Sequence, residues 1–249
     1  MLINAMSALA SAFCVLLLFW TISHLGRRLL ETQKIRLNTG NAIAIWGAAA
    51  VGSLVYSFSD TAWFSAVEAE VYGMSSLFTA AVFWAMLKWE ENADKPHANR
   101  WIVLIAYLMG LSIGVHLLNL LTIPALVFIY FYKKYTFSWK GAVLTLLLSV
   151  VIIVIILYGI IPWLPRISGW FDLLFVNVFR LPYNSGMLFF VVSLVAALFW
   201  GVVATHRKGK VLWNTILLCL TVIIIGYASF AMVVIRSSAK TPTNENQPD

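Results

Sequence analysis

The chain has 249 residues, of which 61% are hydrophobic and 11% charged, and its mean hydropathy is +0.88. An average globular protein is about half apolar and about a quarter charged. The composition therefore excludes a soluble domain and predicts that much of the surface faces lipid. The formal net charge is +7, but the basic residues lie in short segments between apolar runs, which is typical of topology signals and not of a nucleic-acid-binding patch.

Eight apolar stretches are candidates for membrane-spanning helices, each of which needs about 20 residues. The pattern predicts an all-α fold, a polytopic membrane helical bundle of about eight spans, with no nucleic acid among its partners. The spans form one transmembrane domain over residues 1–235, and the polar residues 236–249 are expected to be an extracytoplasmic tail without an apolar period. The predicted spans are 2–23, 41–58, 71–87, 101–115, 117–132, 141–161, 187–205 and 211–235.

The distribution of basic residues predicts the orientation of the chain. Four segments (24–40, 88–100, 133–140 and 206–210) hold thirteen of the seventeen Lys and Arg residues. Eight spans with both termini outside place all four segments in the cytoplasm, as the positive-inside rule requires. We therefore predict a multi-pass protein of the bacterial cytoplasmic (inner) membrane.

The predicted outer segment between the second and third spans carries Asp60, Glu68 and Glu70 and no basic residue. Three carboxylates at a membrane surface are candidates for a general base, for a divalent-metal site or for contacts with an acceptor. Glu68 also fits a capping box with Ser65, and Asp60 also fits a helix start. Glu70 and the following Tyr72 stand where the apolar span begins, a costly position for an ionisable group that lines no cavity.

The fourth and fifth spans are short, and they meet at His116 and Asn119. Fifteen residues of helix cover about 22 Å, less than the roughly 30 Å hydrocarbon layer. We therefore expect a recessed turn beside a cavity that opens outward, where His116 is a hydrogen-bond donor, a proton carrier or a packing residue. The spacing of Gly110 and Gly114 predicts close approach of a neighbouring helix.

Two outer arginines, Arg180 and Arg236, are weaker candidates for binding a phosphate by paired N–H donors. Arg180 belongs to an aromatic-rich outer segment, 162–186, that is also compatible with an interfacial helix in the headgroup region. No nucleotide-binding glycine loop, zinc-protease motif or nucleophile elbow occurs in the sequence.

The stretches SFSDTAWFSAVEAEVYGMSSLF, GLSIGVHLLNL and IRSSAKTPTNENQPD resemble a bacterial family known as a domain of unknown function. That family is similar to the protein O-mannosyltransferases of the GT-C glycosyltransferase superfamily, and the resemblance covers nearly the whole chain. It implies a GT-C-like membrane enzyme that transfers a sugar from a polyprenyl-phosphate donor to an extracytoplasmic acceptor. Glu68, Glu70, Tyr72, His116 and Asn119 would line the outer cavity, with Arg236 near its rim.

The resemblance also implies that the family's catalytic acid lies in an outer loop before residue 1, so that the chain is expected to be a fragment that lacks this acidic loop. The predicted catalytic residues are Glu70, Glu68 and Asp60, and the predicted substrate-binding residues are Tyr72, His116, Asn119, Arg180 and Arg236. No cofactor is expected, since the lipid-linked sugar is a substrate, and a divalent metal stays an open alternative. A non-catalytic scaffold subunit and a secondary transporter are the alternative functions.

Overall fold

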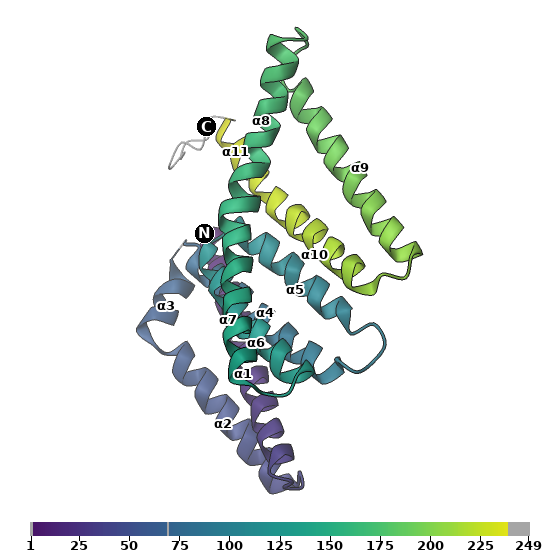
Figure 1. Ribbon diagram of the computed structural model, residues 1–249. Helices are drawn as coiled ribbons and strands as arrows, with labels where there is room; N and C mark the ends of the chain where they lie inside the picture. Colours follow the sequence, from purple (N-terminus) through teal and green to yellow (C-terminus); the bar gives the residue numbers. More distant parts are fainter. Residues whose placement is uncertain (1, 69, 239–249) are drawn as a thin grey trace. The chain divides into compact units, whose positions relative to one another are not determined.

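A computed structural model describes residues 2–68 and 70–238. All regular structure in these residues is helical (Figure 1). The α-helices are α1 (Leu2–Thr32), α2 (Thr39–Ser57), α3 (Asp60–Val67), α4 (Tyr72–Asn92), α5 (Asn99–Ile113), α6 (Ile123–Lys134), α7 (Trp139–Val154), α8 (Ile161–Asn177), α9 (Ser185–Arg207), α10 (Val211–Tyr227) and α11 (Ala231–Ser238). Two 3-10 helices, η1 (Leu117–Thr122) and η3 (Ala228–Phe230), and a π-helix, η2 (Ile155–Ile160), connect some of them.

The structure confirms a polytopic membrane helical bundle. Within residues 2–68 and 70–238, six continuous helical stretches are long and apolar enough to cross a membrane, and a seventh is added if the bent pair α3 and α4 is one span. The predicted number of about eight is higher because α5, which matches the predicted fourth span, has only 15 residues. Large apolar side chains such as Trp46, Val55 and Phe199 are more than 60% exposed, as expected for a surface that faces lipid.

The chain divides into two compact units, residues 1–122 with 225–249, and residues 123–224. In the first unit, α1 and α4 run parallel to each other. Ser7 and Ser11 of α1 lie beside Gly73 at the start of α4, and His24 near the end of α1 lies beside Glu90 and Glu91 at the end of α4.

The contact between α1 and α4 uses small and polar side chains at a nearly heptad spacing. On α1 the buried residues are Ser7, Ala10, Cys14, Thr21 and His24. This period keeps one stripe of a helix against its neighbour, and small side chains let two backbones approach closely within a membrane. Val82 and Trp89 of α4, with Leu120 of η1, complete the core of the unit.

The second unit contains α6 to α9 and most of α10. Residues 139–177 form one continuous helical stretch through η2, so the outer segment that begins at residue 162 starts as an extension of a span and not as a separate interfacial helix. In Figure 1, α9 runs beside α8, and the Oδ1 atom of Asp172 on α8 accepts a hydrogen bond of 3.1 Å from the backbone N–H of Gly186. Ser138, whose hydroxyl accepts from Gly141 N, caps the start of α7.

Candidate functional site: the carboxylate end of the first unit

The three predicted carboxylates lie on α3 and on the connection to α4, which we call the carboxylate end. Asp60 is in the first turn of α3, where a helix dipole favours an acid. Ser59 is the N-cap of this helix, and its side chain accepts from Ala62 N. The predicted capping box was wrong, because the hydroxyl of Ser65 donates to Thr61 O and Glu68 is the C-cap of α3.

The carboxylate end is attached to the first turns of α1. The side-chain amide of Asn4 donates to the carbonyl of Val67 over 2.9 Å and thereby satisfies one of the free carbonyls at the end of α3. A Cβ atom at Gly73 would lie only 3.0 Å from Ser65 O and 3.2 Å from Ser7 O, so α1, α3 and α4 meet backbone to backbone here. The connection that carries Glu68 and Glu70 is therefore anchored at both of its ends.

Glu68, Glu70 and Asp60 are exposed. None of them forms an ion pair with another residue in the parts of the chain that the structure describes. Over residues 2–68 and 70–238, no group of three His, Cys, Asp or Glu side chains is close enough together to hold a metal ion. The carboxylates are thus open to a substrate group that brings a proton or a hydroxyl.

Tyr72 and His116 are brought together although they are 44 residues apart. Their ring centroids lie 5.7 Å apart at an angle of 53°. The backbone N–H of Leu118 donates to the Nδ1 atom of His116 over 3.1 Å, so Nδ1 carries no proton and Nε2 carries the N–H donor. The imidazole can therefore offer one N–H to a phosphate or sugar oxygen from a fixed position.

Asn119 lies next to this pair but is fully buried. Its side-chain oxygen accepts from the Thr79 hydroxyl over 3.2 Å, and its amide donates to the Met109 sulfur over 3.4 Å. These contacts fasten η1 to α4 and α5, which is a packing role, and the predicted contact of Asn119 with a substrate stays a prediction. Thr79 is seven residues beyond Tyr72, about 10 Å along the helix, so Asn119 lies further along α4 than His116, which contacts Tyr72 at the start of that helix; the depth of the turn in a membrane stays a prediction.

The small-residue pair on α5 does accept a close neighbour. A Cβ atom at Gly226, at the end of α10, would lie 2.5 Å from Leu111 N and 2.7 Å from the carbonyl carbon of Gly110. A Cβ atom at Gly114 would lie 3.2 Å from the Ser229 hydroxyl of η3. This confirms the predicted close approach and brings the segment before α11 to the turn that carries His116.

The two arginines are placed differently. Arg236 is exposed in the last turn of α11, in the same unit as the carboxylates. Arg180 belongs to the second unit, where it follows α8 with a positive φ of 53°. The first unit therefore contains the predicted residues Glu68, Glu70, Tyr72, His116 and Arg236, whereas Arg180 belongs to the second unit.

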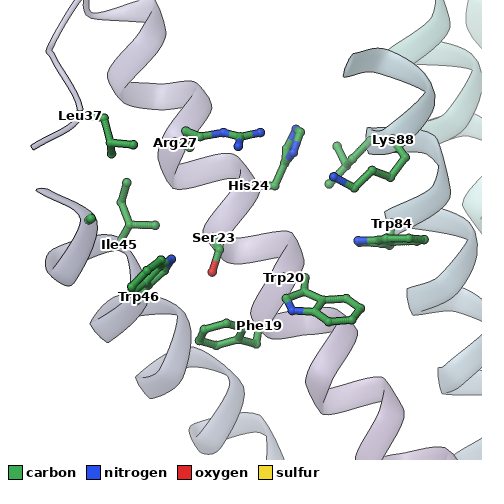
Figure 2. A pocket seen from close by; sticks show the side chains of 12 residues that line it. Phe19, Trp20, Ser23, His24, Arg27, Leu37, Ile45, Trp46, Trp84 and Lys88 are labelled. Atoms are coloured by element: carbon green, nitrogen blue, oxygen red, sulfur yellow. The ribbon is translucent and has the colours of Figure 1, made fainter. Parts of the chain in front are cut away.

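Two cavities of the first unit flank α1. One, of about 160 Å³, lies near the carboxylate end and is lined by Trp63, Tyr56 and several serines. The other, of about 590 Å³, lies toward the opposite end, beside His24, Arg27 and Lys88 (Figure 2). Neither is lined by Glu70 or His116, so the predicted cavity beside the recessed turn stays a prediction.

The opposite end of the same helices, which we call the basic end, holds an ion-pair network that the sequence reasoning missed. Glu91 pairs with Arg27 and with Lys88, and Glu90 pairs with Arg28. The Nδ1 atom of nearly buried His24 lies 3.0 Å from Glu91 Oε1. The sequence pattern that could have predicted this network is a pair of adjacent arginines and a pair of adjacent glutamates near the ends of two predicted parallel spans.

Of three comparisons with known proteins, one finds a match to this chain. No curated protein and no solved structure matches the chain. Residues 1–139, more than half of the chain, match the model of the Protein O-mannosyl-transferase TMEM260 N-terminal domain. This stretch includes α1 to α6, and with them the carboxylates, Tyr72 and His116. The chain therefore belongs to the family of the protein O-mannosyltransferase TMEM260 N-terminal domain.

Proposed function

We propose that this membrane protein acts in glycosyl transfer from a polyprenyl-phosphate sugar to an extracytoplasmic acceptor, such as a protein, at the carboxylate end of its first unit. The observation that carries the proposal is that the family match over residues 1–139 contains six of the eight predicted site residues. Within that stretch, Tyr72 and His116 are in ring contact next to carboxylates without ion-pair partners among the described residues. A GT-C-like arrangement is part of the proposal.

The reaction requires a base on one side of the sugar and charge stabilisation on the other. The acceptor oxygen forms a bond to the anomeric carbon, while the bond from that carbon to the phosphate oxygen breaks and the lipid phosphate leaves with the electron pair. We assign the acceptor proton to the carboxylate of Glu70, with Glu68 and Asp60 as its neighbours. Positioned proton transfer of this kind contributes about 10²- to 10⁴-fold to a rate.

The leaving phosphate needs donors near its developing charge. The Nε2–H of His116 is available for this role because Nδ1 is occupied by Leu118 N. The guanidinium group of Arg236, on the helix that follows the Gly114 contact, is the second donor in the proposal. Tyr72 holds the imidazole ring in place and presents its hydroxyl at the same end.

The test is sugar transfer in membranes that contain this chain, with a labelled polyprenyl-phosphate mannose and an acceptor peptide. The assay is run with the chain alone and with the chain fused to the acidic outer loop that the family resemblance implies. Glu70→Gln should lower the rate by about 10² or more in whichever form is active. Glu31→Gln, an exposed carboxylate at the basic end, is the matched control and should keep the rate. Equal rates for wild type and Glu70→Gln would contradict the assignment.

The proposed orientation is tested separately. Thr61→Cys places a thiol on α3 at the carboxylate end, and Gln33→Cys places one just beyond α1 at the basic end; both positions are exposed. An impermeant maleimide should label Thr61→Cys in intact cells and Gln33→Cys only after permeabilisation. The reverse pattern would turn the carboxylates toward the cytoplasm and remove the basis for an extracytoplasmic acceptor.

A further inference from the structure

The cavity of about 590 Å³ at the basic end has two layers of side chains along α1 (Figure 2). Phe19, Trp20 and Trp46 form an aromatic layer, and His24 and Arg27 lie about one and two helical turns beyond Trp20 along α1. The same order is repeated on α4, where Lys88 lies one turn beyond Trp84 and its Nζ atom is 5.9 Å from the centre of the indole ring. Because α1 and α4 are parallel, the two polar layers coincide.

The charged side chains that line this cavity are cationic. Arg27 and Lys88 both belong to the lining, whereas Glu90 and Glu91 do not. Arg27 pairs with Glu91 and with Glu31, and Lys88 pairs with the same Glu91, but neither of these carboxylates belongs to the cavity lining. The segments 24–40 and 88–100 together contain seven basic and four acidic residues, which leaves an excess of three positive charges at this end.

A buried hydroxyl in the same cavity has no partner. The Oγ atom of Ser23 is shielded from solvent and forms no hydrogen bond in the structure, although such atoms are nearly always satisfied. Ser23 lies between the aromatic and the cationic layers and lines the cavity. Rotation about χ1 of Ser23 would turn the hydroxyl toward the cavity, where an ester or phosphate oxygen of a ligand could accept its hydrogen bond.

We propose that this basic-end cavity binds one anionic glycerophospholipid of the membrane. Its phosphate lies against Arg27 and Lys88, its ester oxygens lie at the level of Ser23, and one acyl chain follows the aromatic layer between α1 and α2. Basic pockets between spanning helices commonly hold anionic headgroups, and indole rings favour the boundary between headgroup and hydrocarbon. A free phosphate ion would pair with the cationic side chains, but it would make no use of the apolar and aromatic side chains that form most of the cavity wall. The site is at the opposite end of α1 from the proposed transfer site and does not depend on that function.

The experiment is native mass spectrometry of the full chain in a neutral detergent, with phosphatidylglycerol and phosphatidylcholine of equal acyl chains as probes. Each basic side chain near an anionic headgroup contributes about fivefold in affinity. We therefore expect a preference of about fivefold or more for phosphatidylglycerol. The variant with Arg27→Gln and Lys88→Gln should lose about 25-fold by the same reasoning.

A second pair of variants leaves the ion pairs intact. Ala42→Trp fills the cavity from α2 and should lower retention of phosphatidylglycerol at least tenfold. Ala48→Trp places the same side chain on an exposed face of α2 outside the lining and should stay within twofold of wild type. Unchanged retention in Ala42→Trp, or equal binding of the two phospholipids, would overturn the proposal. Displacement of phosphatidylglycerol by inorganic phosphate at the same concentration, or by polyprenyl phosphate at a lower one, would also overturn it.

Discussion

The two ends of the parallel pair α1 and α4 are stabilised in different ways. At the basic end, side chains of opposite charge bridge the helices, with Glu91 bound to Arg27 and Lys88. At the carboxylate end, backbones meet at glycine, as at Gly73, and Glu70 forms no ion pair with any described residue. Charge therefore contributes to cohesion at the basic end, whereas at the carboxylate end the described carboxylates form no ion pair and remain available for the proposed reaction.

The largest expected effect comes from the close backbone contact near His116. Gly226→Leu would force a side chain against Leu111 N and Gly110, where even a Cβ atom is too close, and it should lower the free energy of unfolding by about 3 kcal/mol. Thermal unfolding in detergent measures the loss. Gly47→Leu, where a Cβ atom meets nothing within 4 Å, is the control. If the two variants were equally stable, close packing would not stabilise the carboxylate end.

The next largest effect is expected at the basic end. Glu91→Gln leaves Arg27 and Lys88 without their shared carboxylate and should cost about 1–2 kcal/mol, since Glu91 is only partly exposed. The exposed Glu31→Gln should cost less than about 0.5 kcal/mol. Thermal unfolding measured at low and at high salt separates the charge attraction, which salt screens, from the hydrogen bonds. A Glu91→Gln protein as stable as wild type would show that the network contributes no cohesion.

A smaller effect is expected for the buried amide that holds η1. Asn119→Leu keeps the volume but removes the hydrogen bonds to Thr79 and Met109, at a cost of about 1 kcal/mol. Any loss of sugar transfer should then follow the loss of folded protein. A variant with wild-type stability and no transfer would instead place Asn119 among the residues that contact the substrate.

The smallest effect on stability should come from the proposed base itself. Glu70 is exposed and without a described ion-pair partner, so Glu70→Gln should change the free energy of unfolding by less than about 0.5 kcal/mol. Thermal unfolding of Glu70→Gln and of Glu91→Gln, measured under the same conditions, compares the two ends directly. A marked loss of stability would mean that Glu70 has a structural role, and the contrast between the ends would disappear.

The sequence predicted the helical membrane fold, because apolar runs and short basic segments follow from the bilayer alone. It also predicted the glycine contact on α5, since small residues at this spacing let helices approach closely in a membrane. It did not predict that Asn119 is buried, because burial depends on Thr79 and Met109 from other helices. The network of His24 and Glu91 was missed for the same reason: its partners are more than 60 residues apart.

That separation along the chain has a consequence for synthesis. Arg28 leaves the ribosome 62 residues before its partner Glu90, which at about 5–20 residues per second takes roughly 3–12 s. During that interval the only carboxylate that pairs with the guanidinium groups at the end of α1, among the described residues, is Glu31 of the same helix. Once α4 has been made, the same groups are matched by Glu90 and Glu91. In the proposed orientation, one short basic sequence thus first helps to orient a nascent helix and later joins it to a neighbour.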